Sequence, residues 1–302
     1  TCVRRGVAVV VNDQSAESGF AHDSIGDLID MSGPGAELIP YAETHNVVVV
    51  PYPADGVSTE MVDYKIAIKL AGLKAAVYLA SAGKAMNPDE SEEYALPPLT
   101  EITRGMKGLP KVAYVFQVHC TSHPALVGEP ILYGDNIRKL VPTIIHPNEV
   151  LDGAIINPYH GYPIETYVIQ NHPIIKELYR KHGKELYFAG VVITTSQYQE
   201  PDRERSVAIS ANLVKSILGA DGVILTYVNA GAPEVDVAQT AQRCEELGVK
   251  SVIIMWGVKD GNSIESETVH NLPKADSIVN TGDVQEFISL PRVERIIGKS
   301  VT

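Results

Sequence analysis

Four short stretches of the sequence carry side chains that could take part in catalysis or ligand binding. They combine a terminal hydroxyl and thiol, imidazole bases, a phenol, an amide, a guanidinium and a glycine loop. The residues are Thr1, Cys2, Arg4, His119, Tyr159, His160, Asn229 and Gly231. A nucleophile accompanied by acid–base groups is the combination that enzymes use in nucleophilic catalysis.

The first stretch is the start of the chain. The α-amino group of Thr1 has an ordinary pKa of about 8 and could act as the base for the hydroxyl of the same residue. Self-cleavage of a longer precursor would produce such a terminus and would leave the released piece bound as a second chain. The stretch therefore predicts an amide or lactam hydrolase, with Cys2 next to the nucleophile and Arg4 near a substrate carboxylate. The alternative is that the sequence begins at an arbitrary cut in a longer chain.

The second stretch is QVHCTSHP at 117–124, at the end of an apolar run. His119 and His123 are four residues apart, which matches the spacing of metal ligands on a helix, but the stretch does not have the pattern of a helix. A metal site would need further ligands from elsewhere in the chain, so none is predicted here, and a metal held by His119 and His123 is kept as an alternative. An acid–base role suits His119 better, because imidazole titrates near neutral pH. A polar loop without a role is another alternative.

The third stretch is PYHGY at 158–162, in which Tyr159 and His160 stand next to each other. His160 could serve as a general acid or base, or hold a substrate carboxylate, with Tyr159 as a binding group. The alternative is a turn built from the prolines and the glycine around these residues.

The fourth stretch is TYVNAGAP at 226–233, where a strand is followed by Asn229 and Gly231 and a helix starts near Pro233. Backbone N–H groups at such a helix start bind anions, and a substrate carboxylate would suit them. The stretch lacks the spacing of a dinucleotide-binding loop, so no dinucleotide is predicted.

Short apolar runs separated by helical stretches predict the elements that position these residues. The predicted strands are residues 6–11, 46–52, 75–80, 111–118, 187–195, 221–228, 250–256 and 276–281. The predicted helices 202–219 and 233–248 each carry an apolar stripe and end at a glycine. Runs that are apolar on both faces are typical of a largely parallel sheet. The sequence predicts an α/β fold with a doubly wound C-terminal sheet and ligands at the carboxyl ends of its strands.

The domain connection is predicted in the Pro- and Tyr-rich stretch 157–173. We therefore expect an N-terminal α/β domain at 1–160, which would be the remainder of a larger domain, and a Rossmann-like α/β domain at 161–302. In the second domain, Cys244 lies on the apolar stripe of its helix and is expected to be a core residue, not a nucleophile.

The composition argues against several kinds of partner. The chain of 302 residues has a net charge of −12, and its basic residues are interleaved with acids, as in DRER at 202–205. Nucleic acid and anionic membranes require clustered basic residues, so neither is expected as a partner. The apolar runs are shorter than a membrane span. Three cysteines without paired spacing predict no disulfide framework and no zinc site, and we expect a cytoplasmic protein.

Seven blocks along the chain carry a resemblance to one family. They are LIDMSGPGAE (28–37), AGLKAAVYLA (71–80), HPNEVLDGAI (146–155), HPIIKELYRKHGKEL (172–186), GADGVIL (219–225), ADSIVNTGD (275–283) and PRVERIIG (291–298). With these blocks in this order, the sequence resembles the substrate-binding subunit of component B of the glycine, sarcosine and betaine reductases, which is related to the D-proline reductase proprotein.

The resemblance implies the reductive cleavage of a C–N bond in a small amino acid. In this family a precursor cysteine becomes a pyruvoyl group that captures the substrate amine, and a partner subunit with a selenol or thiol attacks the α-carbon. Shortly after LDGAII, where the family carries that cysteine, this chain has NPYHGYP, with His160 nearest the expected position. Histidine cannot form a pyruvoyl group, so no pyruvoyl cofactor is expected.

Taken together, the sequence predicts an enzyme that acts on a C–N bond of a small amino-acid-derived substrate. The first interpretation is an autoprocessed hydrolase that uses Thr1 on a component B-like scaffold, bound to the second chain released by cleavage. One alternative is a component B subunit of a reductase that works with a thiol or selenol partner. The other is a subunit that binds substrate without catalysis.

Overall fold

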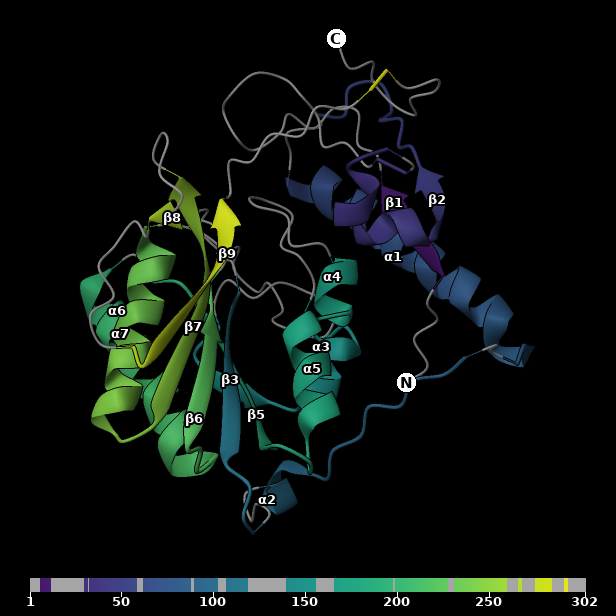
Figure 1. Cartoon of the computed structure of the whole chain (residues 1–302). Helices are drawn as coiled ribbons and strands as arrows, with labels where there is room; N and C mark the ends of the chain where they lie inside the picture. The colour runs from purple at the N-terminus through teal and green to yellow at the C-terminus, as the bar shows by residue number, and fades with distance from the viewer. Residues whose placement is uncertain are drawn as a thin grey trace. The chain divides into compact units, whose positions relative to one another are not determined.

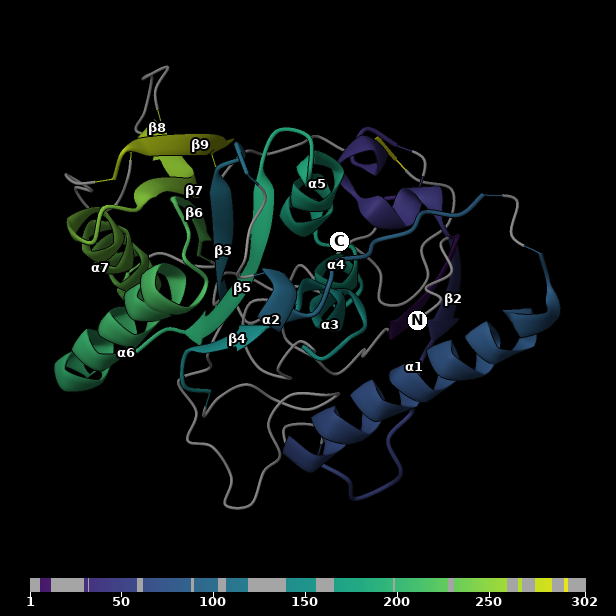
Figure 2. The same cartoon turned by 90° about the horizontal axis from the view of Figure 1, so that it is seen from below.

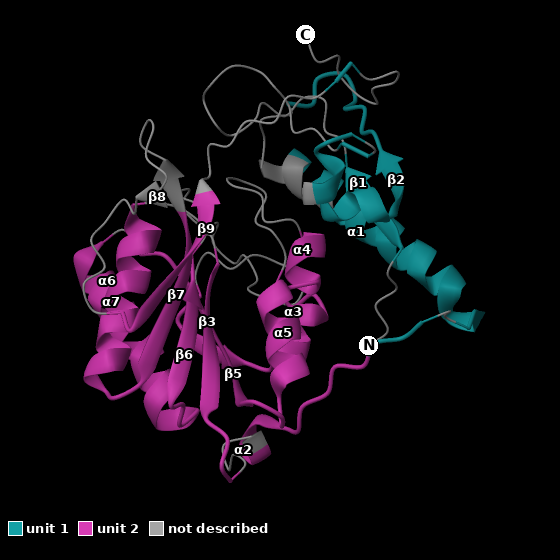
Figure 3. Cartoon of the chain, viewed as in Figure 1, with its two compact units in different colours: residues 1–92, 159–161, 287–302 teal, residues 93–158, 162–286 magenta. Residues whose placement is uncertain are grey.

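The structure is a computed structural model, and it describes residues 6–11, 30–31, 33–58, 62–87, 90–102, 107–118, 140–155, 166–197, 199–227, 231–259, 266–267, 275–283 and 291–292. The chain forms two compact units (Figure 3). Unit 1 comprises residues 1–92, 159–161 and 287–302, and unit 2 comprises residues 93–158 and 162–286. The domain boundary predicted after residue 160 lies outside the described residues and stays a prediction.

Unit 1 contains a small parallel sheet and one long helix. Strands β1 (Val7–Val11) and β2 (His45–Val49) pair in parallel, and helix α1 (Val62–Ala82) packs against β1. Gly72 is required at this contact, because a Cβ there would come within 2.5 Å of Val11 Cγ2. Three short 3-10 turns complete the described part of the unit: η1 (Ala36–Leu38), η2 (Pro40–Glu43) and η3 (Gly83–Ala85).

The strand predicted at 75–80 is wrong, because these residues lie within α1. The run AAVYLA is apolar on all sides, which suggested a buried strand. Its alanines and leucine are strong helix formers, and Val77 is its only β-branched residue. Length decides between the two structures: the helical segment continues for 21 residues, far beyond an ordinary strand.

Unit 2 is built on a mostly parallel sheet (Figure 1). The parallel strands are β3 (Lys111–Val118), β5 (Tyr187–Thr195), β6 (Gly222–Thr226), β7 (Lys250–Lys259) and β9 (Ser277–Asp283). Two short strands, β4 (Thr143–Ile145) and β8 (Ser266–Glu267), run antiparallel to β5 and β7. The order is β4-β5-β3-β6-β7, and β8 and β9 both pair with β7. The predicted α/β class and parallel sheet are confirmed.

Helices cover both faces of this sheet (Figures 1 and 2). Helices α3 (Pro147–Leu151), α4 (Thr166–Gln170) and α5 (Pro173–Lys181) lie on one face. The other face carries α6 (Glu200–Asn212), which continues into the π-helical turn η4 (Leu213–Ile217), and α7 (Ala232–Glu246). The short helix α2 (Leu99–Ile102) precedes β3. Side chains alternate between the faces of each strand, so the sheet has a separate hydrophobic core on each side.

The two cores confirm the predicted stripe of the helix at 233–248. Val237, Ala241 and Cys244 of α7 are buried in the core on the α6–α7 face. Cys244 is fully buried and is therefore a core residue, as expected, and this burial raises the pKa of its thiol to about 12. A π-helical turn follows α6 and shifts the helix register, and Ile217 at the end of this turn is exposed.

The strand order places a topological switch point at β3. From β3 the chain crosses to β5 on one side and then returns to β6 on the other side of β3. In doubly wound sheets, ligands bind outside the carboxyl ends of the strands at the point where the winding direction reverses. In this chain that point is the carboxyl edge between β3 and β6.

Candidate functional site

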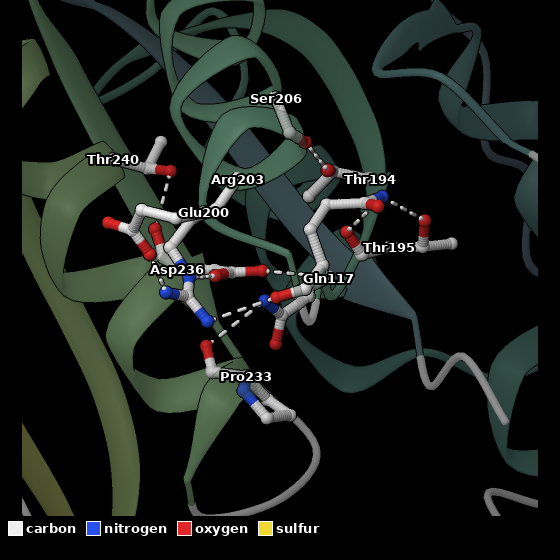
Figure 4. Close-up of polar contacts among 10 residues, drawn as sticks. Gln117, Thr194, Thr195, Glu200, Arg203, Ser206, Pro233, Asp236 and Thr240 are labelled. Carbon is white, nitrogen blue, oxygen red and sulfur yellow. Dashed lines mark hydrogen bonds and ion pairs between the residues drawn. The ribbon is translucent and has the colours of Figure 1, made fainter. Parts of the chain in front are cut away.

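Polar side chains that are closed off from solvent gather where the parallel strands of unit 2 end. The carboxyl ends of β3 and β5 and the first turns of α6 and α7 meet there (Figure 4). The buried polar residues of this edge are Gln117, Thr194, Thr195, Ser196, Ser206, Glu234, Asp236 and Thr240. Burial of a polar group costs free energy unless the group is paired, so the partners of these side chains define the site.

Gln117 joins the central strand to the start of α7. Its Nε2 donates to Pro233 O at 3.0 Å (Figure 4). Gly231 is the N-cap of α7 and has a φ of 84°, which favours glycine. A Cβ on Gly231 would meet no atom of the described residues within 4 Å. The first N–H groups of a helix lack partners within it and favour an anionic group.

A buried ion pair fixes the starts of α6 and α7 to each other. Arg203 Nε donates to Asp236 Oδ1 at 2.5 Å, and Gln197 N donates to Asp236 Oδ2 at 2.7 Å. Arg203 Nη2 also donates to Gln197 O at 3.1 Å, and Arg203 contacts Glu200 as well (Figure 4). Burial raises the pKa of the Asp236 carboxyl, and the hydrogen bonds from Gln197 and Arg203 oppose this shift only in part. The arrangement holds the loop after β5 in place.

Threonines at the end of β5 extend this polar layer. Thr194 Oγ1 lies 3.2 Å from Ser206 Oγ on α6, and Thr195 Oγ1 donates to Leu140 O at 3.2 Å. Gln197 Nε2 donates to Thr195 Oγ1 at 3.2 Å. These contacts pair the hydroxyl groups of the strand end within the protein and fix the edge of the site on this side.

A second polar network lies on the other face of β3. Tyr114 Oη is 2.6 Å from Thr226 Oγ1 and 3.1 Å from His172 Nε2, and the Phe116 ring packs edge-on against the imidazole. Burial lowers the pKa of His172 to about 4 and raises the pKa of Tyr114, so both groups are neutral near pH 7. The network links the start of α5 to the middle of β3 and the end of β6, and it carries no charge.

Most residues that the sequence singled out lie outside the described residues. They are Thr1, Cys2, Arg4, His119, Tyr159, His160 and Asn229, and their roles stay predictions. Gly231 is described, and it forms the N-cap of α7 at the predicted place. In the sequence, His119 follows the last residue of β3 directly, and Asn229 comes three residues after the last residue of β6.

Sequence reasoning missed Gln117, His172 and the Arg203–Asp236 pair. Gln117 had a usable signal, because it is an amide in an otherwise apolar strand, one residue before that strand ends. Arg203 belongs to the stretch DRER, whose charges looked like a solvated helix face. Nothing in the sequence indicates that Arg203 pairs with Asp236, which lies 33 residues later.

Other features in the described part of the chain give no competing site. No group of three or more His, Cys, Asp or Glu residues with the geometry of a metal site occurs among the described residues. No described helix is both long and apolar enough to cross a membrane. The hollow on α1 is an unsuitable site for chemistry, because the described residues that line it all come from this one helix and Lys74 is the only charged residue among them.

Comparisons with known proteins identify the family. A family model described as glycine/sarcosine/betaine reductase component B subunits matches residues 1–302. The chain belongs to this family. The resemblance seen in the sequence blocks is thereby confirmed. No solved structure matches the chain.

Curated component B proteins match along nearly the whole chain. It is 36% identical over 303 residues to "Glycine reductase complex component B subunits alpha and beta" of Acetoanaerobium sticklandii, which covers 99% of this chain and 67% of the relative. It is 34% identical over 276 residues to "Sarcosine reductase complex component B subunit alpha" of Peptoclostridium acidaminophilum, which covers 90% of this chain and 63% of the relative. A betaine reductase component B subunit alpha from the same organism is 33% identical, with 62% of its length covered. The chain thus spans about two thirds of the length of these component B proteins.

Two of the blocks that resemble component B have structural roles in this chain. In HPNEVLDGAI, His146 and Glu149 form a capping box at the start of α3: His146 Nδ1 accepts from Asn148 N, and Glu149 Oε2 accepts from His146 N. In LIDMSGPGAE, the Asp30 carboxylate accepts from Gly33 N at 2.7 Å and from Gly35 N at 3.0 Å. The hydrogen bonds described in these two blocks are local ones that stabilise a helix start and a turn.

Proposed function

We propose that this chain is the substrate-binding part of a component B-type reductase complex that cleaves a C–N bond in a small amino-acid-derived ligand. The observation that carries the proposal is the match of the family model over residues 1–302. Relatives named as subunits of glycine, sarcosine and betaine reductase complexes support it. These relatives favour the reductase interpretation over a hydrolase with a Thr1 nucleophile.

The proposed ligand site is the carboxyl edge between β3 and β6, next to the start of α7. Two features support this position: the switch point of the sheet and the N-cap at Gly231. The N–H groups of the first turn of α7 suit the carboxylate that glycine, sarcosine and betaine share. Direct binding of these three compounds, measured by calorimetry on the purified chain, tests the proposal. The absence of binding by all three would contradict it.

A matched pair of glycine variants tests the location. Gly231 and Gly248 lie at the two ends of α7, both have positive φ, and a Cβ added at either would meet no atom within 4 Å in the part of the chain that the structure describes. Alanine at either position strains the backbone, but only Gly231→Ala changes the proposed anion site. We expect Gly231→Ala to weaken binding of the carboxylate ligands about tenfold, and Gly248→Ala to leave binding unchanged. Equal losses in the two variants would place the ligand elsewhere.

The proposed partners are a further component B polypeptide and a subunit that supplies a thiol or selenol. The support is that the relatives are named as subunits of multi-subunit complexes, in one case as alpha and beta together. We expect product from glycine, sarcosine or betaine only when the chain is combined with such a subunit and a reductant. Amide hydrolysis by the chain alone, lost in Thr1→Ala, would support the hydrolase interpretation instead.

No pyruvoyl group is proposed for this chain. Cys244 does not fit such a group, because it is buried in the hydrophobic core between α7 and the sheet. Cys2 and Cys120 lie outside the described residues. We expect no labelling by a hydrazide reagent and an intact mass without a converted cysteine. Labelling that is lost in Cys2→Ala or Cys120→Ala, but kept in the control Cys244→Ala, would contradict this part of the proposal and would identify the converted residue.

A further inference from the structure

The amide of Gln117 has a fixed orientation that leaves its oxygen without a partner. Gln117 is 1% exposed and its Nε2 donates to Pro233 O at 3.0 Å. A carbonyl oxygen can only accept, so the nitrogen of the amide must face Pro233 and the oxygen must point away from it. Among the described residues, no donor reaches Gln117 Oε1. Figure 4 shows the side chain between the end of β5 and the start of α7.

The core of the protein does not need an amide at this position. Ala113 and Val115, on the same face of β3, pack in an apolar core against α6 and α7. A buried acceptor without a donor costs about 1–3 kcal/mol, whereas an apolar side chain of similar size would avoid this cost. An amide here is therefore explained by a donor that comes from outside the described protein, either a ligand or a buried water.

The surroundings of Gln117 favour a ligand with opposite charges close together. The first turn of α7 offers N–H groups and a positive dipole end, which suit a carboxylate. Glu234, the residue after Pro233, is buried, and burial of Tyr227 at the end of β6, together with the charge of Glu234, raises the pKa of the Tyr227 phenol. A buried carboxylate and an amide oxygen together favour a group that carries N–H donors and positive charge.

We propose that Gln117 Oε1 is the amine-recognition group of this site: it accepts a hydrogen bond from the ammonium of a ligand whose carboxylate binds at the first turn of α7. Such a subsite discriminates against a quaternary ammonium. This inference rests on the proposed function, because it names how the substrate nitrogen is recognised at the same site. A quaternary ammonium has no N–H group and would leave the oxygen unpaired. A hydrogen bond made there is shielded from water, which increases its contribution.

The test uses glycines of increasing N-methylation as ligands: glycine, sarcosine, dimethylglycine and betaine. Each methyl group replaces one N–H and keeps the carboxylate. For the unmodified chain we expect sarcosine to bind about 10- to 100-fold more tightly than betaine, because a hydrogen bond to a charged group is lost. Gln117→Met removes the acceptor at similar volume. It should weaken sarcosine by about the same factor and betaine by much less, so that the preference disappears.

Two further variants make the result specific. Gln242→Met is the matched control, because Gln242 is a partly exposed glutamine on α7 that hydrogen-bonds to Glu246 rather than to the site. It should keep the preference for sarcosine. If Gln117→Met does not fold, Gln117→Asn is used instead. It keeps the oxygen and the nitrogen of the amide but moves both back by one methylene, so it should reduce the preference for sarcosine over betaine without abolishing it. Thermal unfolding of each variant separates loss of fold from loss of recognition.

The outcomes distinguish this inference from the function on which it rests. If none of the ligands binds the unmodified chain, the proposed function fails and the inference fails with it. The ligands could instead bind while Gln117→Met weakens the binding of sarcosine and betaine equally, or weakens the binding of neither. The function then stands and the inference is overturned, because a buried water would occupy the position beside Oε1.

Discussion

Unit 2 and unit 1 bury their apolar side chains to very different extents. Every residue of β5 in unit 2 is buried, and helices cover both faces of its sheet. In unit 1, the structure describes all of β1 and β2, and within these strands only Ala8 is buried. The helix α1 beside them exposes Val77 and Tyr78.

The comparison shows that similar strand sequences reach different burial because different elements cover them. VAVVV in β1 and FAGVVI within β5 are both apolar runs, yet only the second lies between two helical layers. A two-stranded sheet is rarely stable alone, whereas a sheet with several strands and both faces covered has its own core. We therefore expect unit 2 to respond strongly to changes in its interior, and the described surface of unit 1 to respond weakly.

The largest expected effect comes from the buried ion pair of unit 2. The Arg203 side chain is 13% exposed, so Arg203→Met leaves the Asp236 carboxylate buried without its partner. We expect a loss of about 3–5 kcal/mol in the free energy of unfolding, measured by urea denaturation. The double variant Arg203→Met/Asp236→Met should recover most of this loss, because it removes the unpaired charge as well.

Arg205 on the same helix is the matched control. It pairs with Asp202 at 2.9 Å, but its side chain is 67% exposed. Arg205→Met should cost less than about 1 kcal/mol, because water screens the pair. Similar losses for Arg203→Met and Arg205→Met would mean that the interior of unit 2 is no more sensitive than its surface.

The next effect is a pH dependence caused by His172. Its pKa is lowered from 6.5 to about 4 by burial, so the folded chain binds this proton less readily than the unfolded chain. The contribution of the neutral imidazole is therefore fully present above pH 6.5 and is lost as the pH falls from 6.5 towards 4. The shift corresponds to about 3 kcal/mol. His172→Phe should remove this part of the pH dependence, measured as the difference between the two unfolding curves across pH.

His182 provides the contrast for this measurement. Burial lowers its pKa too, but His182 is only partly buried, so His182→Phe should remove a smaller part of the pH dependence. An identical pH dependence in the unmodified chain and in His172→Phe would show that the imidazole is open to solvent, and the depth of the unit 2 core at α5 would have to be revised.

The sequence predicted the fold of unit 2 well, because its elements depend on local signals. The runs at 111–118 and 187–195 match β3 and β5 at both ends, and Gly248 follows α7 with a φ of 74°. The error at 75–80 arose where an alanine-rich run is apolar all round, so that periodicity could not separate a helix from a strand. The switch point follows from the strand order, which a single sequence does not contain.

The candidate site was predictable only in part, because its contacts join residues far apart in the chain. Gly231 was found from a local pattern, a loop between a strand and a helix. The contact between Gln117 and Pro233 spans 116 residues, and no local pattern marks it. Tyr114 and His172 likewise come from different elements, and each has an ordinary core sequence around it. Tertiary packing, not propensity, gives these residues their environment.

The smallest effect, and the most direct test of the comparison, is a pair of valines in helices. Val237 in α7 is 2% exposed and Val77 in α1 is 66% exposed. Val237→Ala leaves a cavity in the unit 2 core and should cost about 2 kcal/mol. Val77→Ala removes no buried contact and replaces a β-branched residue by the best helix former, so it should be neutral or stabilise by about 0.5 kcal/mol. A loss for Val77→Ala as large as that for Val237→Ala would mean that another surface covers α1 in solution, and the contrast between the two units would then disappear.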